Sequence, residues 1–446
     1  MIFNRKSIEA LLEGDWYREP KDDWQIDNIV ASHAQAREDY QNQHQSLFVA
    51  MNHDTWRQHT NESGKWNDTH PTTLYAAQYI NGVIATEPIP QLNDAIPQFI
   101  VSDTYEALNT LAHSVYDDFD ATLIATTGTR GVKTINTLLK ELFIENERSI
   151  VIKQHDHTSL ALLTALASAD RNTEYVISEA TYEALTANQS HQFKHYVPDT
   201  AIFSTIETND NQTEDDVAKG YYHLIETMFV ESHVILNSDS SAFEKLYQMI
   251  DSDKLNVTTY GFTPNSDVFV LRHKQAGDYA QVKANVLGEN ADFQTKLKET
   301  EDIAHILSVL ATLKVSHMPL YMAVGYIRDF IPLEERQQAT QYTTHKGALY
   351  TIVDNDSAPT MEGMLEAFQQ LQNQTNYKEA RTLAIIGSVA GLTDDNKAAQ
   401  YQALAEEMIQ ADIDLVWGYG EDAPLYLKHI PEKKVVGHYQ SINQLA

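Results

Sequence analysis

The sequence contains no cysteine, has few basic residues and has no long apolar run. Without cysteine among its 446 residues, the chain has no disulfide, no thiolate metal ligand and no cysteine nucleophile. Lys and Arg total 32 against 63 Asp and Glu, which gives a net charge of −31 at pH 7. A chain of this charge repels nucleic-acid phosphates and anionic membrane surfaces, and no basic run offsets it. We therefore expect no nucleic-acid partner.

The apolar segments are too short for membrane insertion but sufficient for globular cores. No run approaches the ~18 residues that a membrane helix needs, and the N-terminal segment does not resemble a signal peptide. The hydrophobic fraction is 42%, and 23 Tyr and 14 Phe supply large side chains for burial. At about 100–200 residues per domain, the length predicts several domains. We expect a cytoplasmic globular protein with no membrane insertion.

The pattern of apolar runs predicts three domains, at residues 1–115, 116–330 and 331–446. The middle region alternates β-rich runs with helical stretches, which is typical of a parallel sheet with both faces covered. An amphipathic helix is predicted over residues 296–314. The sequence thus predicts an α/β fold with a small N-terminal domain, a central mostly parallel sheet with helices on both faces, and a smaller C-terminal α/β domain. The predicted central strands are residues 121–127, 149–153, 174–178, 200–205, 233–237, 256–260 and 268–272.

A glycine-containing loop between the first central strand and the next helix is the motif that suggests chemistry. It reads Thr-Gly-Thr-Arg-Gly-Val-Lys-Thr over residues 127–134. Glycine lets backbone N–H groups turn toward an anion, and the following helix N-terminus adds partial positive charge. A strict phosphate-binding loop has glycine directly before its lysine, but Val132 precedes Lys133 here, and valine tolerates positive φ badly. The residues by themselves leave a phosphate loop and an ordinary glycine turn equally open.

Several segments, in the same order along the chain, resemble the Mur ligase family. The loop at 127–134 resembles that family's Thr-Gly-Ser/Thr-x-Gly-Lys-Thr loop. Val-Ile-Ser-Glu at 176–179, Val-Ala-Lys at 217–219 and Ile-Leu-Asn-Ser-Asp at 235–239 resemble further family segments. Shorter similarities lie at residues 48–51, 82–85, 101–104, 335–336, 352–355, 384–387 and 411–415. The resemblance covers nearly the whole chain.

This resemblance implies a three-domain ligase with a P-loop-type central domain, a Rossmann-like C-terminal domain and a hinge near residues 328–336. Such an enzyme uses ATP and Mg²⁺ to join a carboxylate, here a cell-wall precursor, to an amine through an acyl phosphate. The protein then chiefly positions reactants and neutralises charge. The resemblance implies Lys133 and Glu179 as catalytic residues. The implied nucleotide-binding residues are Gly128, Thr129, Arg130, Gly131, Lys133, Thr134, Asp302, Arg336 and Asp354, and the implied Mg²⁺ ligands are Thr134, Glu179 and Asp210.

Several positions depart from the family pattern. The family has a metal-binding His after the fourth central strand, where Glu207 or Asp210 would supply an oxygen ligand instead. The family's carbamylated Lys falls at Tyr221, two residues after Lys219. Its Gly-x-His-Asn segment is represented by Thr-Glu-Asp at 300–302. These departures keep a second hypothesis open: a Mur ligase homologue without catalysis that binds a nucleotide or a protein partner.

Two other residue pairs have simple structural explanations. His155 and His157 share one face if they lie on a strand, as metal ligands do, but 18 His make chance pairs common. Asp215 and Asp216 precede a helix and suit N-capping as well as metal binding. As partners we expect small molecules, a carboxylate precursor and an amine, and we expect a monomer or weak homodimer.

Overall fold

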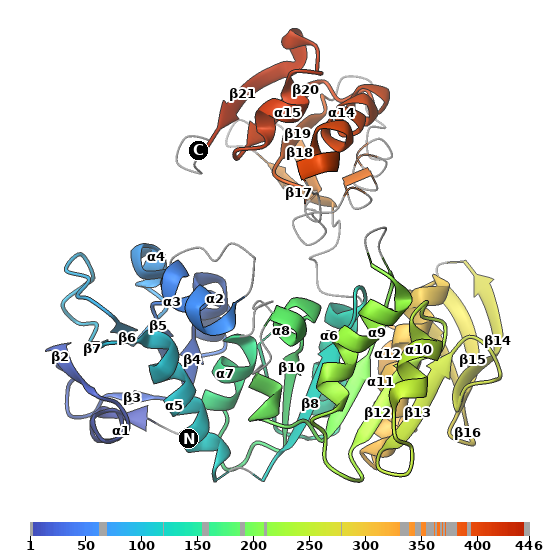
Figure 1. Cartoon of the computed structure of the whole chain (residues 1–446), viewed down its shortest axis with the longest axis horizontal. Helices are drawn as coiled ribbons and strands as arrows, with labels where there is room; N and C mark the ends of the chain where they lie inside the picture. Colours follow the sequence, from blue (N-terminus) through green and yellow to red (C-terminus); the bar gives the residue numbers. More distant parts are fainter. Residues whose placement is uncertain are drawn as a thin grey trace. The chain divides into compact units, whose positions relative to one another are not determined.

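The protein divides into two compact units, Met1–Ile331 and Pro332–Ala446, each taken here by itself (Figure 1). A computed structural model describes residues 3–61, 69–118, 120–153, 160–187, 192–208, 212–277, 279–330, 339–343, 349–353, 361, 364–365, 368, 371, 381–389 and 394–440. In these ranges no helix is long and apolar enough to cross a membrane. The domain boundary near residue 115 stays a prediction, because the first unit holds two sheets that share one core.

The first unit begins with a five-stranded sheet in the order β2-β7-β6-β5-β4. Its parallel strands are β4 (Asn28–Val30), β5 (Ser46–Val49), β6 (Gly82–Ala85) and β7 (Gln98–Val101), with β2 (Gly14–Arg18) antiparallel to β7. Side chains from α2 (His33–Gln41) and α4 (Thr69–Ala76) pack on one face. The other face receives α1 (Arg5–Leu11), α3 (His53–Thr60) and α5 (Thr104–Tyr116). A two-stranded ribbon of β1 (Phe3–Asn4) and β3 (Gln25–Ile26) lies near α1.

The central sheet has nine strands in the order β16-β15-β14-β13-β12-β11-β8-β10-β9. All seven predicted strands are present: β8 (Thr122–Thr127), β9 (Ile150–Ile152), β10 (Tyr175–Glu179), β11 (Thr200–Phe203), β12 (His233–Asn237), β13 (Asn256–Gly261) and β14 (Val268–Ala276). They pair in parallel, as predicted. Two strands that were not predicted, β15 (Tyr279–Val286) and β16 (Glu289–Thr295), extend the sheet in antiparallel pairing.

Helices cover both faces of the central sheet, as predicted. Along β8, Leu123 and Ala125 enter one core while Ile124 enters the other, because successive strand residues point to opposite faces. The core around Ile124 also holds α6 (Val132–Glu145), α11 (Thr300–Val315) and α12 (Leu320–Ile327). The opposite core holds α7 (Leu160–Ala167), α8 (Tyr182–Ala187), α9 (Glu214–Ile225) and α10 (Phe243–Met249). Each fully buried Leu or Ile contributes ~1.5–3 kcal/mol, so both helix layers are held firmly on the sheet.

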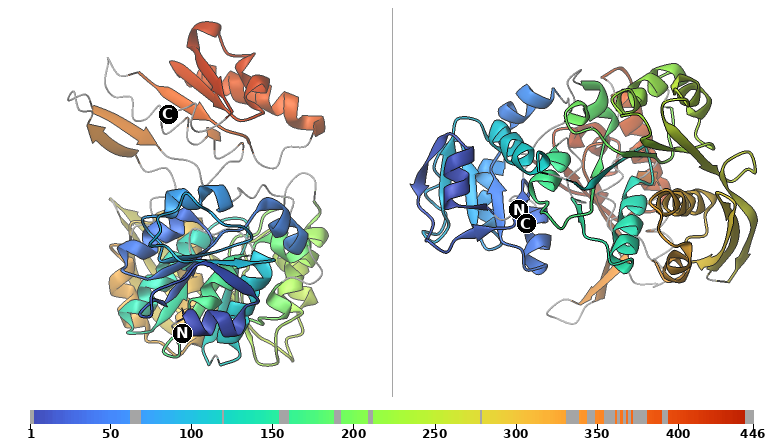
Figure 2. Two further views of the ribbon diagram at one scale, coloured as in Figure 1. Left: turned by 90° about the vertical axis from the view of Figure 1, so that its left-hand side faces the viewer. Right: turned by 90° about the horizontal axis from the view of Figure 1, so that it is seen from below.

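The N-terminal sheet is joined to the central sheet through a shared core and a buried polar network. The N-terminal sheet and the antiparallel strands β14–β16 lie at opposite ends of the first unit (Figure 2). Between the sheets, the Lys153 ammonium beyond β9 donates to Asn28 at 2.5 Å and to the Asp39 carboxylate at 3.1 Å. Asp39 also accepts from the side chains of Asn28 at 2.7 Å and Gln35 at 2.9 Å. Lys153 therefore ties the central sheet to the N-terminal sheet.

The second unit is the smaller predicted α/β domain. Its three-stranded parallel sheet has the order β19-β20-β21, formed by β19 (Leu383–Ile386), β20 (Leu415–Tyr419) and β21 (Val435–Tyr439). A hairpin of β17 (Ala339–Thr343) and β18 (Leu349–Val353) belongs to the same unit. Helices α14 (Asp394–Gln410) and α15 (Ala423–Leu427) supply Leu404, Met408 and Tyr426 to the core beneath the sheet. The 3-10 turns η1 (Gln192–Lys194) and η2 (Glu432–Lys434) complete the described elements of the two units.

Candidate functional site

The glycine loop lies at the carboxyl end of β8, in the middle of the central sheet. Beyond β8 the chain passes to β9 and β10 on one side and to β11 on the other. In open α/β sheets, ligands bind outside the carboxyl ends of the strands at such a reversal of strand order. The loop therefore occupies the position that this fold offers to a ligand.

Two glycines carry the positive φ angles of the loop. Gly128 has φ 144° and Gly131 has φ 85°, and Gly131 is the N-cap of α6. Val132 is the first residue of that helix, is 6% exposed and has no positive φ, so valine bears no backbone strain there. Lys133 follows as the second helical residue. Because each helical residue turns by about 100°, the lysine projects from a different side of α6 than a lysine directly after Gly131 would.

The segment after β11 holds the loop in place. The Thr129 N–H donates to the Thr205 carbonyl at 2.8 Å, and the Thr129 hydroxyl donates to the same oxygen at 2.9 Å. The Ser204 hydroxyl donates to the Arg130 carbonyl at 2.6 Å. A Cβ on Gly128 would lie 2.0 Å from the Ser204 oxygen, so only glycine permits this approach. The loop is thus preorganised by its neighbouring strand.

Helix α11 brings a carboxylate and an imidazole to the same loop. The Arg130 guanidinium pairs with Glu207 and, at 3.3 Å, with the Glu301 carboxylate. The Glu301 oxygen also lies 3.8 Å from Nε2 of His305, a side chain that is 2% exposed. That Nε2 is 3.3 Å from the Thr205 hydroxyl and would lie 2.0 Å from a Cβ on Gly131. The contribution of Glu301 and His305 was not predicted, because it depends on the packing of α11 near the loop.

Other predicted site residues reach the same edge of the sheet. Glu179 ends β10 and pairs in register with Thr126, the residue before the last of β8. Thr134 lies in the first turn of α6 and is buried, while Asp302 lies in the first turn of α11. Lys133, Thr134, Glu179 and Asp302 are therefore brought to the carboxyl edge that carries the loop. Two carboxylates, Glu207 and Glu301, pair with Arg130 at this edge.

Several predicted residues cannot be placed in this site. Arg336, Asp354 and Asp210 lie outside the described residues, as do His155, His157 and most of the expected hinge at 328–336.

The residues at the position of the family's carbamylated Lys have structural roles. Tyr221 lies on the buried face of α9, and burial raises the pKa of its phenol. Lys219 lies exposed on the same helix. The N-cap of α9 is Thr213, with which Asp216 forms a capping box, so neither predicted aspartate is itself the cap. Asp215 instead pairs with Lys245 at 3.0 Å.

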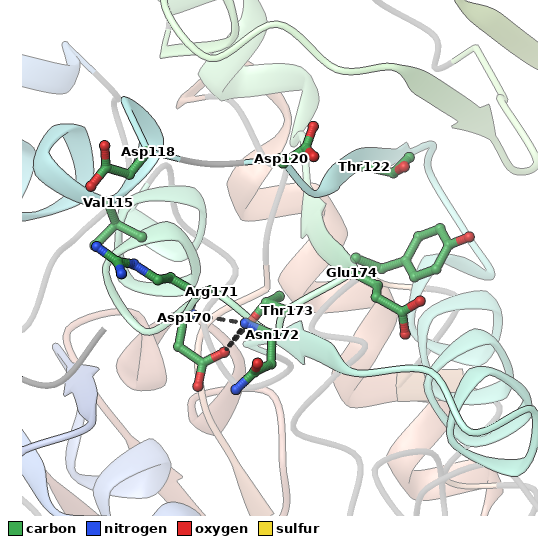
Figure 3. A pocket seen from close by; sticks show the side chains of 10 residues that line it. Val115, Asp118, Asp120, Thr122, Asp170, Arg171, Asn172, Thr173 and Glu174 are labelled. Atoms are coloured by element: carbon green, nitrogen blue, oxygen red, sulfur yellow. Dashed lines mark hydrogen bonds between the residues drawn. The ribbon is translucent and has the colours of Figure 1, made fainter.

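A separate pocket of about 370 Å³ lies at the opposite, amino-terminal edge of the same sheet (Figure 3). Thr122 and Tyr175, the first residues of β8 and β10, belong to its lining. Its other lining residues include Asp118, Asp120, Asp170, Arg171 and Glu174. Because the strands separate it from the loop, this pocket takes no part in the candidate site.

Comparison with known proteins identifies the family. Residues 126–312 match the model of the Mur ligase middle domain. These residues form a Mur ligase middle domain. Two UDP-N-acetylmuramoyl-tripeptide–D-alanyl-D-alanine ligases are similar over most of their length. The enzyme of Buchnera aphidicola is 20% identical over 74% of this chain and 69% of its own, and that of Rickettsia prowazekii is 19% identical over 80% and 78%.

Solved Mur ligases share the fold of this chain. The diaminopimelate-containing tripeptide–D-alanyl-D-alanyl ligase of Acinetobacter baumannii superposes with a TM-score of 0.60, at 15% identity over 100% of this chain and 91% of that chain. The ligase MurF of Thermotoga maritima, solved in complex with ADP, gives 0.55 at 16% identity over 94% and 89%. These structures confirm the predicted α/β fold with its N-terminal, central and C-terminal sheets.

The glycine loop of this chain fits a phosphate group, although its lysine does not directly follow Gly131. Gly128 and Gly131 have the backbone geometry that such loops use, and the first N–H groups of α6 point out of the helix end. Thr134 and Glu179 supply the hydroxyl and carboxylate oxygens that Mg²⁺ prefers. Val132, however, places a buried apolar side chain where a strict loop has its lysine.

Proposed function

We propose that this Mur ligase homologue is an ATP-dependent ligase that forms an amide between a carboxylate and an amine. The observation that carries the proposal is the glycine loop at the carboxyl end of β8, opening α6 beside Glu179. A carboxylate oxygen of the substrate attacks the γ-phosphorus of ATP, ADP leaves, and an acyl phosphate forms. The amine nitrogen then attacks the acyl carbon, the C–O bond to phosphate breaks, and the nitrogen releases a proton.

In this proposal the chain supplies position and charge rather than covalent chemistry. The N–H groups of the loop and of the first turn of α6 orient the phosphates, with Arg130 and Lys133 offsetting their charge. Thr134 and Glu179 would hold Mg²⁺, which supplies further positive charge at the transferring phosphoryl group. The names of the two curated relatives suggest a UDP-muramoyl-peptide-like carboxylate and a dipeptide amine as substrates.

A homologue that binds a nucleotide or a protein partner without catalysis is the second candidate. It is favoured by the buried Val132 at the head of α6 and by the two carboxylates that pair with Arg130. Both features would weaken the binding of the terminal phosphate of a nucleotide. They leave the backbone of the loop intact, so nucleotide binding persists in this alternative.

Two measurements separate the candidates. Calorimetric titration with Mg²⁺–ATP compares the wild type with Lys133→Ala, and we expect about tenfold weaker binding for the variant, as for the loss of one charge-assisted hydrogen bond. Phosphate release is then measured with a UDP-muramoyl tripeptide and D-alanyl-D-alanine. Nucleotide binding without amine-dependent phosphate release would favour the second candidate. Absence of binding in the wild type would refute both nucleotide-dependent functions.

A further inference from the structure

The contacts of Glu301 single it out among the carboxylates near the loop. It lies in the first turn of α11 with 34% of its side chain exposed, and its Oε1 faces two nitrogen-bearing side chains. Arg130 Nε is 3.3 Å from that oxygen, and His305 Nε2 is 3.8 Å from it. One carboxylate oxygen of the chain therefore lies within 4 Å of both a guanidinium and an imidazole.

The same two nitrogen groups border the phosphate loop. Arg130 is a loop residue, and His305 Nε2 lies so close to Gly131 that a Cβ there would be 2.0 Å away. A guanidinium and an imidazole N–H are donors that suit phosphate oxygens as well as carboxylate oxygens. His305 is 2% exposed beside Glu301, whereas Glu301 sits on a partly exposed first turn. Because Glu301 is partly exposed, its side chain can rotate away from both nitrogen groups without unfolding the helix.

We propose that Arg130 and His305 form a phosphate subsite for the nucleotide, and that Glu301 occupies this subsite in its absence. The inference rests on the proposed nucleotide binding and adds a residue, His305, to the phosphate contacts. The subsite would also compensate for the valine at the start of α6. A strict loop has a lysine ammonium at that position, and here Arg130 and His305, which lie outside α6, would donate to the phosphate instead. Glu301 then acts as an intramolecular competitor of the phosphate.

The surrounding charges fit a competition at this subsite. Glu207, beyond β11, pairs with Arg130 from another side and stays available to hold the guanidinium when Glu301 moves away. Lys133 on α6 belongs to the same edge of the sheet and adds attraction for an anion. Among the described residues, Glu301 is the carboxylate that lies within 4 Å of both Arg130 and His305, so its removal is the sharpest perturbation.

The test is a calorimetric titration with ADP at constant salt and pH. Glu301→Gln keeps the shape of the side chain but removes the charge, and we expect ADP to bind about threefold more tightly, the scale of a partly exposed ion pair. Glu289→Gln is the matched control, because it removes a carboxylate that pairs with Lys314 near the other end of α11. We expect this control to bind ADP as the wild type does.

Two further variants probe the donors. Arg130→Gln and His305→Gln should each weaken ADP binding about tenfold, the scale of a charge-assisted hydrogen bond. Thermal unfolding reports whether the buried His305→Gln variant is folded. If that variant is unfolded, the ADP affinities of Arg130→Gln and Glu301→Gln decide whether the subsite exists.

The outcomes separate this inference from the proposed function. If the wild type binds ADP but Glu301→Gln binds no more tightly, the subsite is refuted while nucleotide binding stands. If neither protein binds ADP, both proposals fall. If ADP binds to Glu301→Gln but not to the wild type, the competition is supported, and Mg²⁺–ATP binding to the wild type then decides the proposed function.

Discussion

Removing the Asp39 carboxylate should strongly destabilise the first unit. Asp39 accepts from Asn28 at 2.7 Å, from Gln35 at 2.9 Å and from the Lys153 ammonium at 3.1 Å, and Lys153 is 6% exposed. Asp39→Asn leaves that ammonium buried without its counter-charge, which costs about 3–5 kcal/mol in comparable pairs. We expect this loss in the free energy of unfolding, measured by urea denaturation at neutral pH with intrinsic tryptophan fluorescence.

A double variant tests the cause of that loss. Replacing both partners, Asp39→Asn with Lys153→Met, removes the uncompensated charge and should recover most of the lost free energy. Lys245→Gln is the control, since it breaks the exposed pair with Asp215 and should cost ~0–1 kcal/mol. A cost below about 1 kcal/mol for Asp39→Asn, or no recovery in the double variant, would refute the reasoning.

The same pair predicts a dependence of stability on pH. Burial lowers the pKa of the Lys153 ammonium, and the Asp39 carboxylate opposes that shift. Between the lowered pKa and the ordinary value, the unfolded chain binds a proton that the folded chain does not, so the free energy of unfolding rises with pH there. Asp39→Asn lowers the pKa of Lys153 further. The free energy of unfolding of Asp39→Asn should therefore begin to rise with pH at a lower pH than that of the wild type. A rise that begins at the same pH in both proteins would contradict this.

Three further substitutions probe the loop and the second unit. Gly131→Ala should destabilise the first unit by about 1–3 kcal/mol in thermal unfolding, because φ is 85° there and His305 fills the space of a Cβ. A variant as stable as the wild type would contradict this. Val132→Lys should tighten Mg²⁺–ATP binding about tenfold in calorimetry if its ammonium reaches the phosphates, and unchanged affinity in a folded variant would show that it does not. Tyr401→Phe should cost about 1–2 kcal/mol in urea denaturation of the second unit, because the hydroxyl donates to Asp422 at 3.0 Å and accepts from the Val389 N–H at 2.9 Å; a change below ~0.3 kcal/mol would argue against these bonds.

The central strands could be predicted because their sequences are short, apolar and bounded by turns. The missed β15 also carried a signal, since Ala280, Val282, Ala284 and Val286 alternate with polar residues and are all buried. The two-residue turn to β16 has positive φ at Leu287 and Gly288, the geometry of a tight hairpin. Leu287 is a poor residue for that geometry, so the turn lacks the Asn-Gly or Asp-Gly pair that marks a hairpin in a sequence.

Helix α11 illustrates where prediction from sequence stops. The amphipathic pattern predicted a helix over residues 296–314, and the structure has Thr300–Val315. The pattern does not indicate which element the first turn contacts. Arg130 and Glu301 are separated by most of the central domain, so their pairing depends on the stacking of α11 near α6.

The sequence by itself determined the α/β class, the parallel central sheet and the place of the glycine loop, because these follow from local periodicity and from residues adjacent in the chain. Tertiary structure alone decided which groups contact the loop. The Thr205 carbonyl accepts from Thr129, the Glu301 carboxylate pairs with Arg130, and the His305 ring packs against Gly131. The physical reason is that electrostatic and packing interactions act over distance in space. Strands and helices far apart in sequence meet at one edge of the sheet, and no local pattern records which side chains they bring together.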